Sequence, residues 1–299
     1  MAALVLVRYG ELALKSTPVR REFEQTLRRN ILDQFVAAGL ACRLRSDRGH
    51  LYVEADDGAA AVAVLRRVFG VTSVSEVEEV ATDRDAIRSA ALRHIDPLLG
   101  PAMSFAIRAR RTGQHPFTSQ QLAGDLGGDV LTHFADRHPT VDLDTPQAEV
   151  FVEVRDSRTY LSTTRAAGPG GLPLGVAGQV AALVDGIRGA LGAYLMMKRG
   201  CRCAIVPTEA ARPLVEDVLR RFDPKARISE ALADSAAATD ALSTIAAAVH
   251  ADAVVLPLGV DDYPAAREKW GERLVYSPTV GFTDEEVESR WRAVVALAS

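Results

Sequence analysis

The segment that most constrains the fold of this 299-residue chain lies between residues 180 and 200. Residues 180–184 form an uninterrupted apolar run, which predicts a buried strand. A glycine-containing turn follows, and residues 190–198 predict a helix that stops at Gly200. A strand that leads through a tight turn into a helix presents free backbone N–H groups and the positive end of the helix dipole to a phosphate. The segment therefore predicts a nucleotide-binding α/β unit whose turn lacks the usual polar side chains.

Two stretches flank this turn. Gly-Gly-Leu-Pro stands at residues 170–173, and Tyr-Leu-Met-Met-Lys-Arg-Gly stands at residues 194–200. With these flanks the chain resembles the tRNA 4-thiouridine synthetases, also called tRNA sulfurtransferases or thiamine-biosynthesis sulfurtransferases. The resemblance implies that a pyrophosphate-binding loop of the pattern Ser-Gly-Gly-x-Asp-Ser, which holds ATP, lies between the flanks.

The loop of this chain departs from that pattern. Residues 184–189 read Val-Asp-Gly-Ile-Arg-Gly, which is one residue short and lacks both serines and one glycine. Arg188 stands at the position of the family's aspartate, and Asp185 puts a carboxylate where phosphate would approach. We predict a degenerate nucleotide loop made of Asp185, Gly186, Arg188 and Gly189 and no bound cofactor, ATP being implied only by the resemblance. The alternative is that Arg188 contacts a phosphate, so that a nucleotide binds without turnover.

Composition and charge set the wider frame. With 48% hydrophobic and 25% charged residues, the chain has the composition of a soluble globular protein, and its length predicts two or three domains. The net charge of −4 argues, by itself, against a nucleic-acid partner. Residues 1–50, however, hold nine basic and five acidic side chains. This basic region is compatible with RNA binding, and the alternative is a solvated helix face.

The first 80 residues have the periodicities of a ferredoxin-like domain. The predicted order of strand, helix, two strands, helix and strand gives an antiparallel sheet with both helices on one face. The first helix is predicted to begin with a hydroxyl cap ahead of Pro18 and to end at Gly39. The start of the domain, Val-Arg-Tyr-Gly-Glu-Leu-Ala-Leu-Lys at residues 7–15, again resembles the same synthetases. The strands are predicted at residues 4–7, 41–44, 50–54 and 71–80, and the second helix at residues 58–69.

Residues 82–165 predict a second α/β unit, which closes with a hairpin at residues 149–164. Three of its stretches resemble the THUMP domain, a tRNA-binding module of thiouridine synthases, RNA methyltransferases and pseudouridine synthases. They are Phe-Ala-Ile-Arg at 105–108, Pro-Phe-Thr-Ser at 116–119 and Val-Asp-Leu-Asp-Thr-Pro at 141–146.

Arginines at the end of a strand can grip phosphates bidentately, and basic residues at a helix start are helped by the dipole there. Such contacts position an RNA stem by its shape. The alternative for Arg108 and Arg111 is pairing with nearby acids. The candidate RNA-binding residues are Lys15, Arg20, Arg21, Arg108, Arg110 and Arg111.

Residues 176–299 are expected to form the family's adenylation domain, a Rossmann-like parallel sheet of the adenine nucleotide alpha hydrolase type. The strands are predicted at 180–184, 203–206, 253–258 and 274–278, and the helices at 190–198, 212–222, 240–250 and from Thr283 onward.

Three cysteines, Cys42, Cys201 and Cys203, do not form a disulfide framework. Neither a secretory signal nor a long apolar segment is present, so we expect a cytoplasmic protein without a membrane partner. Cys201 and Cys203 would share one strand face, which favours packing over metal or redox chemistry. Because no cysteine follows Cys203, the chain lacks the late reactive thiol that the resemblance implies for sulfur transfer.

Together these features predict a tRNA-binding relative of the synthetases that takes part in tRNA thiolation without catalysing it, with no metal site. The alternative is an active ATP-dependent tRNA sulfurtransferase that uses free sulfide or a separate carrier. A third possibility is a purely structural partner protein. The expected partners are tRNA, an active tRNA-modifying enzyme and, by resemblance, a second copy in a homodimer. The predicted parts are a ferredoxin-like domain at 1–80, a THUMP domain at 81–167, a linker at 168–175 and a degenerate adenylation domain at 176–299.

Overall fold

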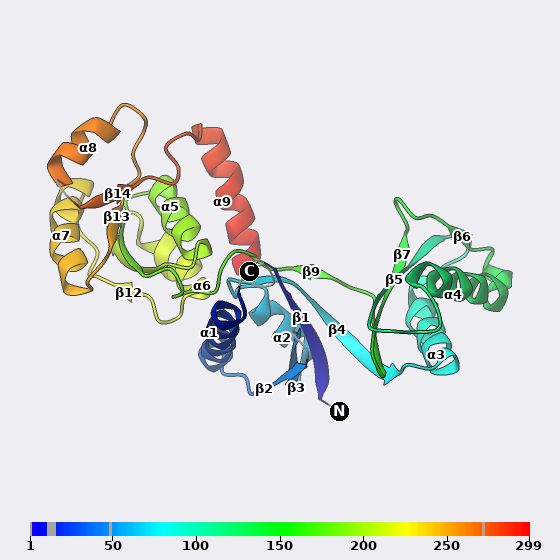
Figure 1. The fold of residues 1–299 in the computed structure, drawn as a ribbon. Helices are drawn as coiled ribbons and strands as arrows, with labels where there is room; N and C mark the ends of the chain where they lie inside the picture. The colour runs from blue at the N-terminus through cyan, green and yellow to red at the C-terminus, as the bar shows by residue number, and fades with distance from the viewer. Residues whose placement is uncertain (1, 11–15, 48–49, 271–272) are drawn as a thin grey trace. The chain divides into compact units, whose positions relative to one another are not determined.

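The computed structural model describes residues 2–10, 16–47, 50–270 and 273–299, and Figure 1 shows their helices and strands. The chain divides into two compact units. The first comprises Met1–Leu6, Arg45–Val62 and Val74–Ala166, and the second comprises Val7–Leu44, Ala63–Ser73 and Ala167–Ser299. Both units therefore take part of the amino-terminal 80 residues, and the division into three domains stays a prediction. Among the described residues, no helix is long and apolar enough to cross a membrane.

The amino-terminal elements follow the predicted ferredoxin-like order. Their strands lie in the order β2-β3-β1-β4, as that fold requires. The second helix ends earlier than predicted, at Leu65. The elements are β1 (Ala3–Tyr9), α1 (Thr17–Ala37), β2 (Arg43–Asp47), β3 (His50–Ala55), α2 (Gly58–Leu65) and β4 (Val71–Ala81).

Helix α1 follows from the pattern of its residues. Leu27, Ile31 and Phe35 recur every four positions and are buried, as the helical period predicts. Gly39 ends the helix in the left-handed region, with φ of 68°. Ser16 occupies the N-cap position, but its side chain makes no capping hydrogen bond, so the predicted hydroxyl cap is wrong for this residue.

The next region continues the same sheet in the order β4-β8-β7-β5-β6, and β9 pairs with β4. Helix α4 begins with a capping box, because the Thr118 side chain accepts from Gln121 N–H while the Gln121 side chain accepts from Thr118 N–H. The elements are α3 (Arg84–Ile95), the short 3₁₀ helix η2 (Asp96–Leu98), β5 (Ser104–Thr112), α4 (Ser119–His133), the 3₁₀ turn η3 (Ala135–Arg137), β6 (Thr140–Val141), β7 (Ala148–Arg155), β8 (Arg158–Ser162) and β9 (Ala166–Ala167).

The carboxyl-terminal elements form a parallel sheet, as predicted, with the strand order β12-β11-β10-β13-β14. The order reverses at β10, and ligands of such sheets bind beyond the carboxyl ends of the strands at that point. The elements are β10 (Gln179–Val184), α5 (Ile187–Lys198), β11 (Arg202–Pro207), the π-helix η4 (Leu214–Leu219), α6 (Arg220–Phe222), β12 (Arg227–Ile228), α7 (Ser235–Ala248), β13 (Ala253–Val255), α8 (Tyr263–Trp270), β14 (Leu274–Tyr276) and α9 (Asp284–Ala298).

Successive residues of β10 bury their side chains on opposite faces of this sheet. Ala182 packs with α5, η4 and α9, whereas Leu183 packs with α7 on the other face. Figure 1 shows α5 and α7 on opposite sides of the strands. Because both faces are covered, the strands read as continuous apolar runs.

Several elements of this region differ from the sequence predictions in their bounds or type. Helix α5 begins at Ile187, three residues early, so Arg188 and Gly189 lie in its first turn and not in a loop. Helix α7 begins at Ser235, because the Asp234 side chain caps Ala237 N–H. The segment predicted as one helix at 212–222 is helical throughout, but residues 214–219 form a π-helix. Strand β13 ends at Val255, two residues ahead of Pro257.

Candidate functional site

The two stretches that flank the turn pack against each other. Leu172 N–H donates to the Lys198 carbonyl at 3.0 Å, and Gly175 N–H donates to the Gly200 carbonyl at 2.7 Å. Gly171 has φ of 74°, and a Cβ there would lie 2.1 Å from the Lys198 oxygen, so only glycine allows this approach. The Gly-Gly-Leu-Pro segment is thus the docking partner of the carboxyl end of α5.

The first turn of α5 carries its own carboxylate. Asp185 follows β10, and a Cβ built on Gly189 would lie 3.3 Å from Asp185 Oδ1, which places this oxygen beside the helix start. The hydroxyl of Ser235 donates to Asp185 Oδ2 at 3.0 Å. A negative charge is favourable at the amino end of a helix. Asp185 therefore supplies internally the anion that a bound phosphate would otherwise provide.

Arg188 joins the first turn of α5 to the segment that leads into α9. Its Nη1 donates to the Thr279 carbonyl at 2.8 Å, and its Nη2 donates to the Phe282 carbonyl at 3.0 Å and to Asp284 Oδ1 at 2.7 Å. Three protein oxygens thus engage two nitrogens of the guanidinium group. A phosphate would have to compete with them for this cation.

Hydroxyl groups beyond the neighbouring strands are enclosed. Thr279 is completely buried and Thr208 is 4% exposed, and neither hydroxyl has a hydrogen-bond partner among the described residues. Ser277 is engaged, since its hydroxyl accepts from Leu258 N–H and donates to the Leu258 carbonyl. Single threonines and serines carry no local sequence signal, so the burial and the partners of these hydroxyls could not be predicted.

The thiols of the parallel sheet lie in the core. Cys203 is 2% exposed and Cys201 is 6% exposed, and both pack in the apolar cluster that includes α5. Burial is the main cause that raises the pKa of the Cys201 thiol, and it raises the pKa of Cys203 well above its ordinary value. Both groups are therefore protonated at neutral pH, as expected for packing residues.

The arginines predicted to bind RNA on β5 differ in their partners. Arg108 Nε donates to Glu149 Oε1 at 2.8 Å, so the alternative of an acid partner is confirmed for this residue. Arg111 is exposed, and its Nη1 donates to the Gly113 carbonyl at 3.0 Å. Arg110 is exposed and makes no ion pair with another residue in the described part of the chain.

Arg110 lies on the sheet face opposite the one that packs on α3 and α4, because Phe105 and Ile107 face that helical core. Two ion pairs lie on the same face of the sheet. Arg155 pairs with Glu153 at 2.6 Å, and Arg158 pairs with Glu79. Of the three β5 arginines, Arg110 therefore has the most N–H groups left to bind a phosphate.

The remaining candidates lie on and before α1. Arg20 is exposed and lies 3.7 Å from Glu24, whose carboxylate also accepts a hydrogen bond from Tyr9 at 2.9 Å. Arg21 is exposed and has no ion-pair partner among the residues described. Lys15 lies outside the described residues. Arg20 and Arg21 belong to the second compact unit and the β5 arginines to the first.

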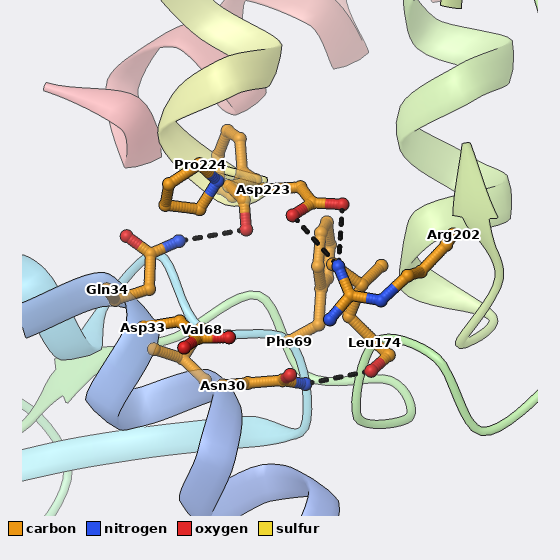
Figure 2. Close-up of a pocket in the computed structure, with 10 residues that line it drawn as sticks. Asn30, Asp33, Gln34, Val68, Phe69, Leu174, Arg202, Asp223 and Pro224 are labelled. Carbon is orange, nitrogen blue, oxygen red and sulfur yellow. Dashed lines mark hydrogen bonds and ion pairs between the residues drawn. The ribbon is translucent and has the colours of Figure 1, made fainter. Parts of the chain in front are cut away.

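A polar junction within the second unit was not predicted from the sequence, because it joins α1 to segments more than 140 residues away (Figure 2). Asn30 donates to the Leu174 carbonyl at 3.0 Å, and Gln34 donates to the Phe222 carbonyl at 2.9 Å. Arg202 Nη1 donates to both oxygens of the buried Asp223 at 3.1 and 3.2 Å. Burial raises the pKa of Asp223 more than the charge of Arg202 lowers it.

Comparison with protein families gives two matches. The ThiI ferredoxin-like domain matches residues 4–75, and the THUMP domain matches residues 81–164.

Curated relatives are about one third identical to this chain over the residues that align. A probable tRNA sulfurtransferase of Methanothermobacter thermautotrophicus is 37% identical over 214 residues, which are 70% of this chain and 53% of that protein. One from Halobacterium salinarum is 34% identical over 260 residues, which are 82% of this chain and 64% of that protein. The chain thus spans less than two thirds of the length of these relatives.

Solved structures share the fold. PH1313 from Pyrococcus horikoshii aligns with a TM-score of 0.81 and 25% identity over 98% of this chain and 99% of that one. A 4-thiouridine synthetase, solved in complex with RNA and bound ATP, aligns with a TM-score of 0.78 and 22% identity over all of this chain and 86% of that one.

Proposed function

Since the chain belongs to the tRNA sulfurtransferase family, we propose that it binds tRNA and assists tRNA thiolation without activating the uridine itself. The observation that carries this proposal is the charge arrangement around the start of α5. Asp185 stands beside the first turn, and Arg188 is engaged by three protein oxygens.

These residues do not fit ATP. A triphosphate at the amino end of α5 would meet the carboxylate of Asp185, and close anions repel each other. Phosphoryl and nucleotidyl chemistry requires that the pyrophosphate be held and its charge offset by preorganised donors. Here the available cation, Arg188, is tied to Asp284 and two carbonyl groups.

Sulfur delivery by this chain alone is disfavoured for a separate reason. A sulfur carrier needs a thiolate that its donor can reach. Cys201 and Cys203 are buried thiols with raised pKa values, and burial also raises the pKa of the half-buried Cys42. The part left to the chain is to bind tRNA, through Arg110, Arg111, Arg20 and Arg21, and to present it to an active enzyme.

The test combines a thiolation assay with a binding assay. The purified protein is incubated with unmodified tRNA, ATP and sulfide, and 4-thiouridine is measured in the digested RNA by mass spectrometry. We expect tRNA binding by fluorescence anisotropy and no thiolated product. An active tRNA sulfurtransferase, assayed in parallel, shows that the reagents are competent. Because sulfide replaces a cysteine carrier, a thiolated product would show that residues 184–189 form a working loop and would overturn the proposal.

Two further assays address the expected partners. Adding this protein to the active enzyme should raise or lower its rate of thiolation, and an unchanged rate at saturating concentration would count against an accessory role. We also propose a homodimer, which light scattering would detect as a mass of twice 32.1 kDa.

A further inference from the structure

A cavity at the carboxyl end of α1 is lined by three arginines. Arg67 follows α2, whereas Arg220 and Arg221 form the start of α6, and Gln34 and Glu216 complete the polar part of the lining. All of these residues belong to the second compact unit. We propose that this cavity binds a backbone phosphate of RNA, an assignment that rests on the proposed tRNA-binding function.

The lining of the cavity carries positive charge that no carboxylate among the described residues balances. Arg220 is neutralised by Glu216, which it contacts through Nε at 2.5 Å and through Nη2 at 3.2 Å. Arg67 and Arg221 pair with no carboxylate among the described residues. Arg67 Nε donates to the Ala63 carbonyl at 3.1 Å, and Arg221 Nη1 donates to the Ala298 carbonyl at 3.2 Å. Both residues therefore keep N–H groups and a full positive charge for another acceptor.

The positive charges of Arg67 and Arg221 act on each other. Burial lowers the pKa of Arg67, and the charge of Arg221 lowers it further, so the two guanidinium groups are close enough to repel. The carboxyl end of α1 contributes about half a negative charge, which is smaller than the two positive charges it faces. An unbalanced cation pair of this kind is stabilised by an anion.

The guanidinium N–H groups of Arg67 and Arg221 are of a kind that binds phosphate. Guanidinium groups bind phosphate through parallel N–H donors, and two of them can hold separate oxygens of the same group. The main chain beneath is fixed, because Gln34 Nε2 donates to the carbonyls of Arg221 and Phe222, both at 2.9 Å. The cavity is thus lined by two guanidinium groups that each keep N–H donors, above a main chain that Gln34 holds in place.

The experiment uses the full chain and two probes, inorganic phosphate and tRNA. Arg67→Gln and Arg221→Gln each remove one of the two charges. Arg292→Gln is the matched control, because Arg292 is exposed on α9 and does not line the cavity. The melting temperature is measured in phosphate and in chloride of equal ionic strength, and tRNA affinity is measured over a range of salt concentrations.

We expect phosphate to raise the melting temperature of the wild type above its value in chloride, and this gain to disappear in Arg67→Gln and Arg221→Gln but not in Arg292→Gln. We expect each cavity variant to weaken tRNA binding on the order of tenfold and to reduce the salt slope by about one. In chloride, both cavity variants should melt close to the melting temperature of the wild type, because relief of the repulsion between the two cations offsets part of the carbonyl hydrogen bond that each variant loses. A cooperative melt at that temperature also shows that they are folded.

The two arms separate the possible failures. Loss of the phosphate effect with unchanged tRNA affinity would assign the cavity to a free phosphate compound and overturn the RNA assignment. Unchanged phosphate and tRNA responses in both variants would overturn the site altogether. If the wild type binds no tRNA, the proposed function fails and the RNA assignment fails with it, while the phosphate arm still decides whether the cavity is an anion site.

Discussion

Arg188 and Asp284 are separated by 96 positions in the chain, yet Nη2 of one lies 2.7 Å from Oδ1 of the other. This contact joins the first turns of α5 and α9, and the Phe282 carbonyl shares the same nitrogen. Arg188 therefore holds the first turns of these two helices together.

Arg188→Ala should destabilise the protein. Hydrogen bonds from a charged donor contribute about 1.5–3 kcal/mol, whereas an exposed ion pair contributes about 0–1 kcal/mol. Because the Asp284 side chain is 95% exposed, most of the effect should come from the two carbonyl bonds. We expect a loss of about 1–3 kcal/mol in urea unfolding, against less than about 1 kcal/mol for Asp284→Ala. Equal losses in the two variants would contradict this division.

Replacing residues 185–189 with the family's six-residue Ser-Gly-Gly-x-Asp-Ser loop, which adds the residue that this segment lacks, should leave a folded protein. The replacement removes the Arg188 contacts, but contacts at the carboxyl end of α5, such as Leu172 N–H to the Lys198 carbonyl, remain. We expect a cooperative thermal transition at a lower temperature than that of the wild type and stronger ATP binding in calorimetry. The control is the same replacement with alanine at the loop aspartate, and aggregation of both chimaeras would show that residues 185–189 are required for folding.

Arg110→Ala should weaken tRNA binding and lower the slope of log affinity against log salt by about one. Arg108→Ala, the matched control on the same strand, removes a guanidinium that is held by Glu149 and should change the slope less. Anisotropy titrations at several salt concentrations measure both. A larger slope change for Arg108→Ala would exchange the roles assigned to the two residues.

The buried thiols should react slowly in the native state. Burial raises the pKa values of Cys201 and Cys203, which lowers the thiolate fraction at any given pH, and both side chains are almost inaccessible. With a disulfide reagent at pH 8 we expect about one of the three cysteines to react, namely the half-buried Cys42, and all three to react in denaturant. Fast labelling of Cys203 in the folded protein would contradict its placement in the core.

Asp223→Asn should change the pH dependence of stability. Burial raises the pKa of Asp223 in the folded state above 3.8, so the protonated form is favoured by folding. The stability of the wild type relative to Asp223→Asn should therefore fall as the pH rises from about 3 through the raised pKa and then level off. Urea unfolding of both proteins across this range measures the difference. A relative stability that rises with pH would mean that Arg202 outweighs burial.

Much of the architecture could be predicted because its signals are local. The apolar period of α1, the continuous run of β10 and the capping residue Thr283 each lie within one short window. The ends of elements were harder to predict. Helix α7 begins five residues before the predicted start because Asp234 caps it, and the π-helix at 214–219 has no distinct local pattern.

The residues of the candidate site could be chosen from the sequence, but their contacts could not be predicted from it. The substitution at Arg188 is visible in the sequence, whereas its acceptors lie 91 to 96 positions away. Likewise, the partner of Asp185 is Ser235, 50 positions on. Arg67 and Arg221 line the same cavity although they come from segments that no periodicity connects. Such long-range contacts follow from how helices dock on the sheet, and this information is absent from any short window.

The close approach of Gly171 to the carbonyl of Lys198 means that the linker and α5 stabilise each other without help from a ligand. The residues of the intervening turn can therefore vary without separating these two flanks, although replacing Arg188 loses its contacts with the segment before α9. Likeness in the flanking motifs is thus evidence of a shared fold, and activity must be sought separately in residues 184–189, which lie between them.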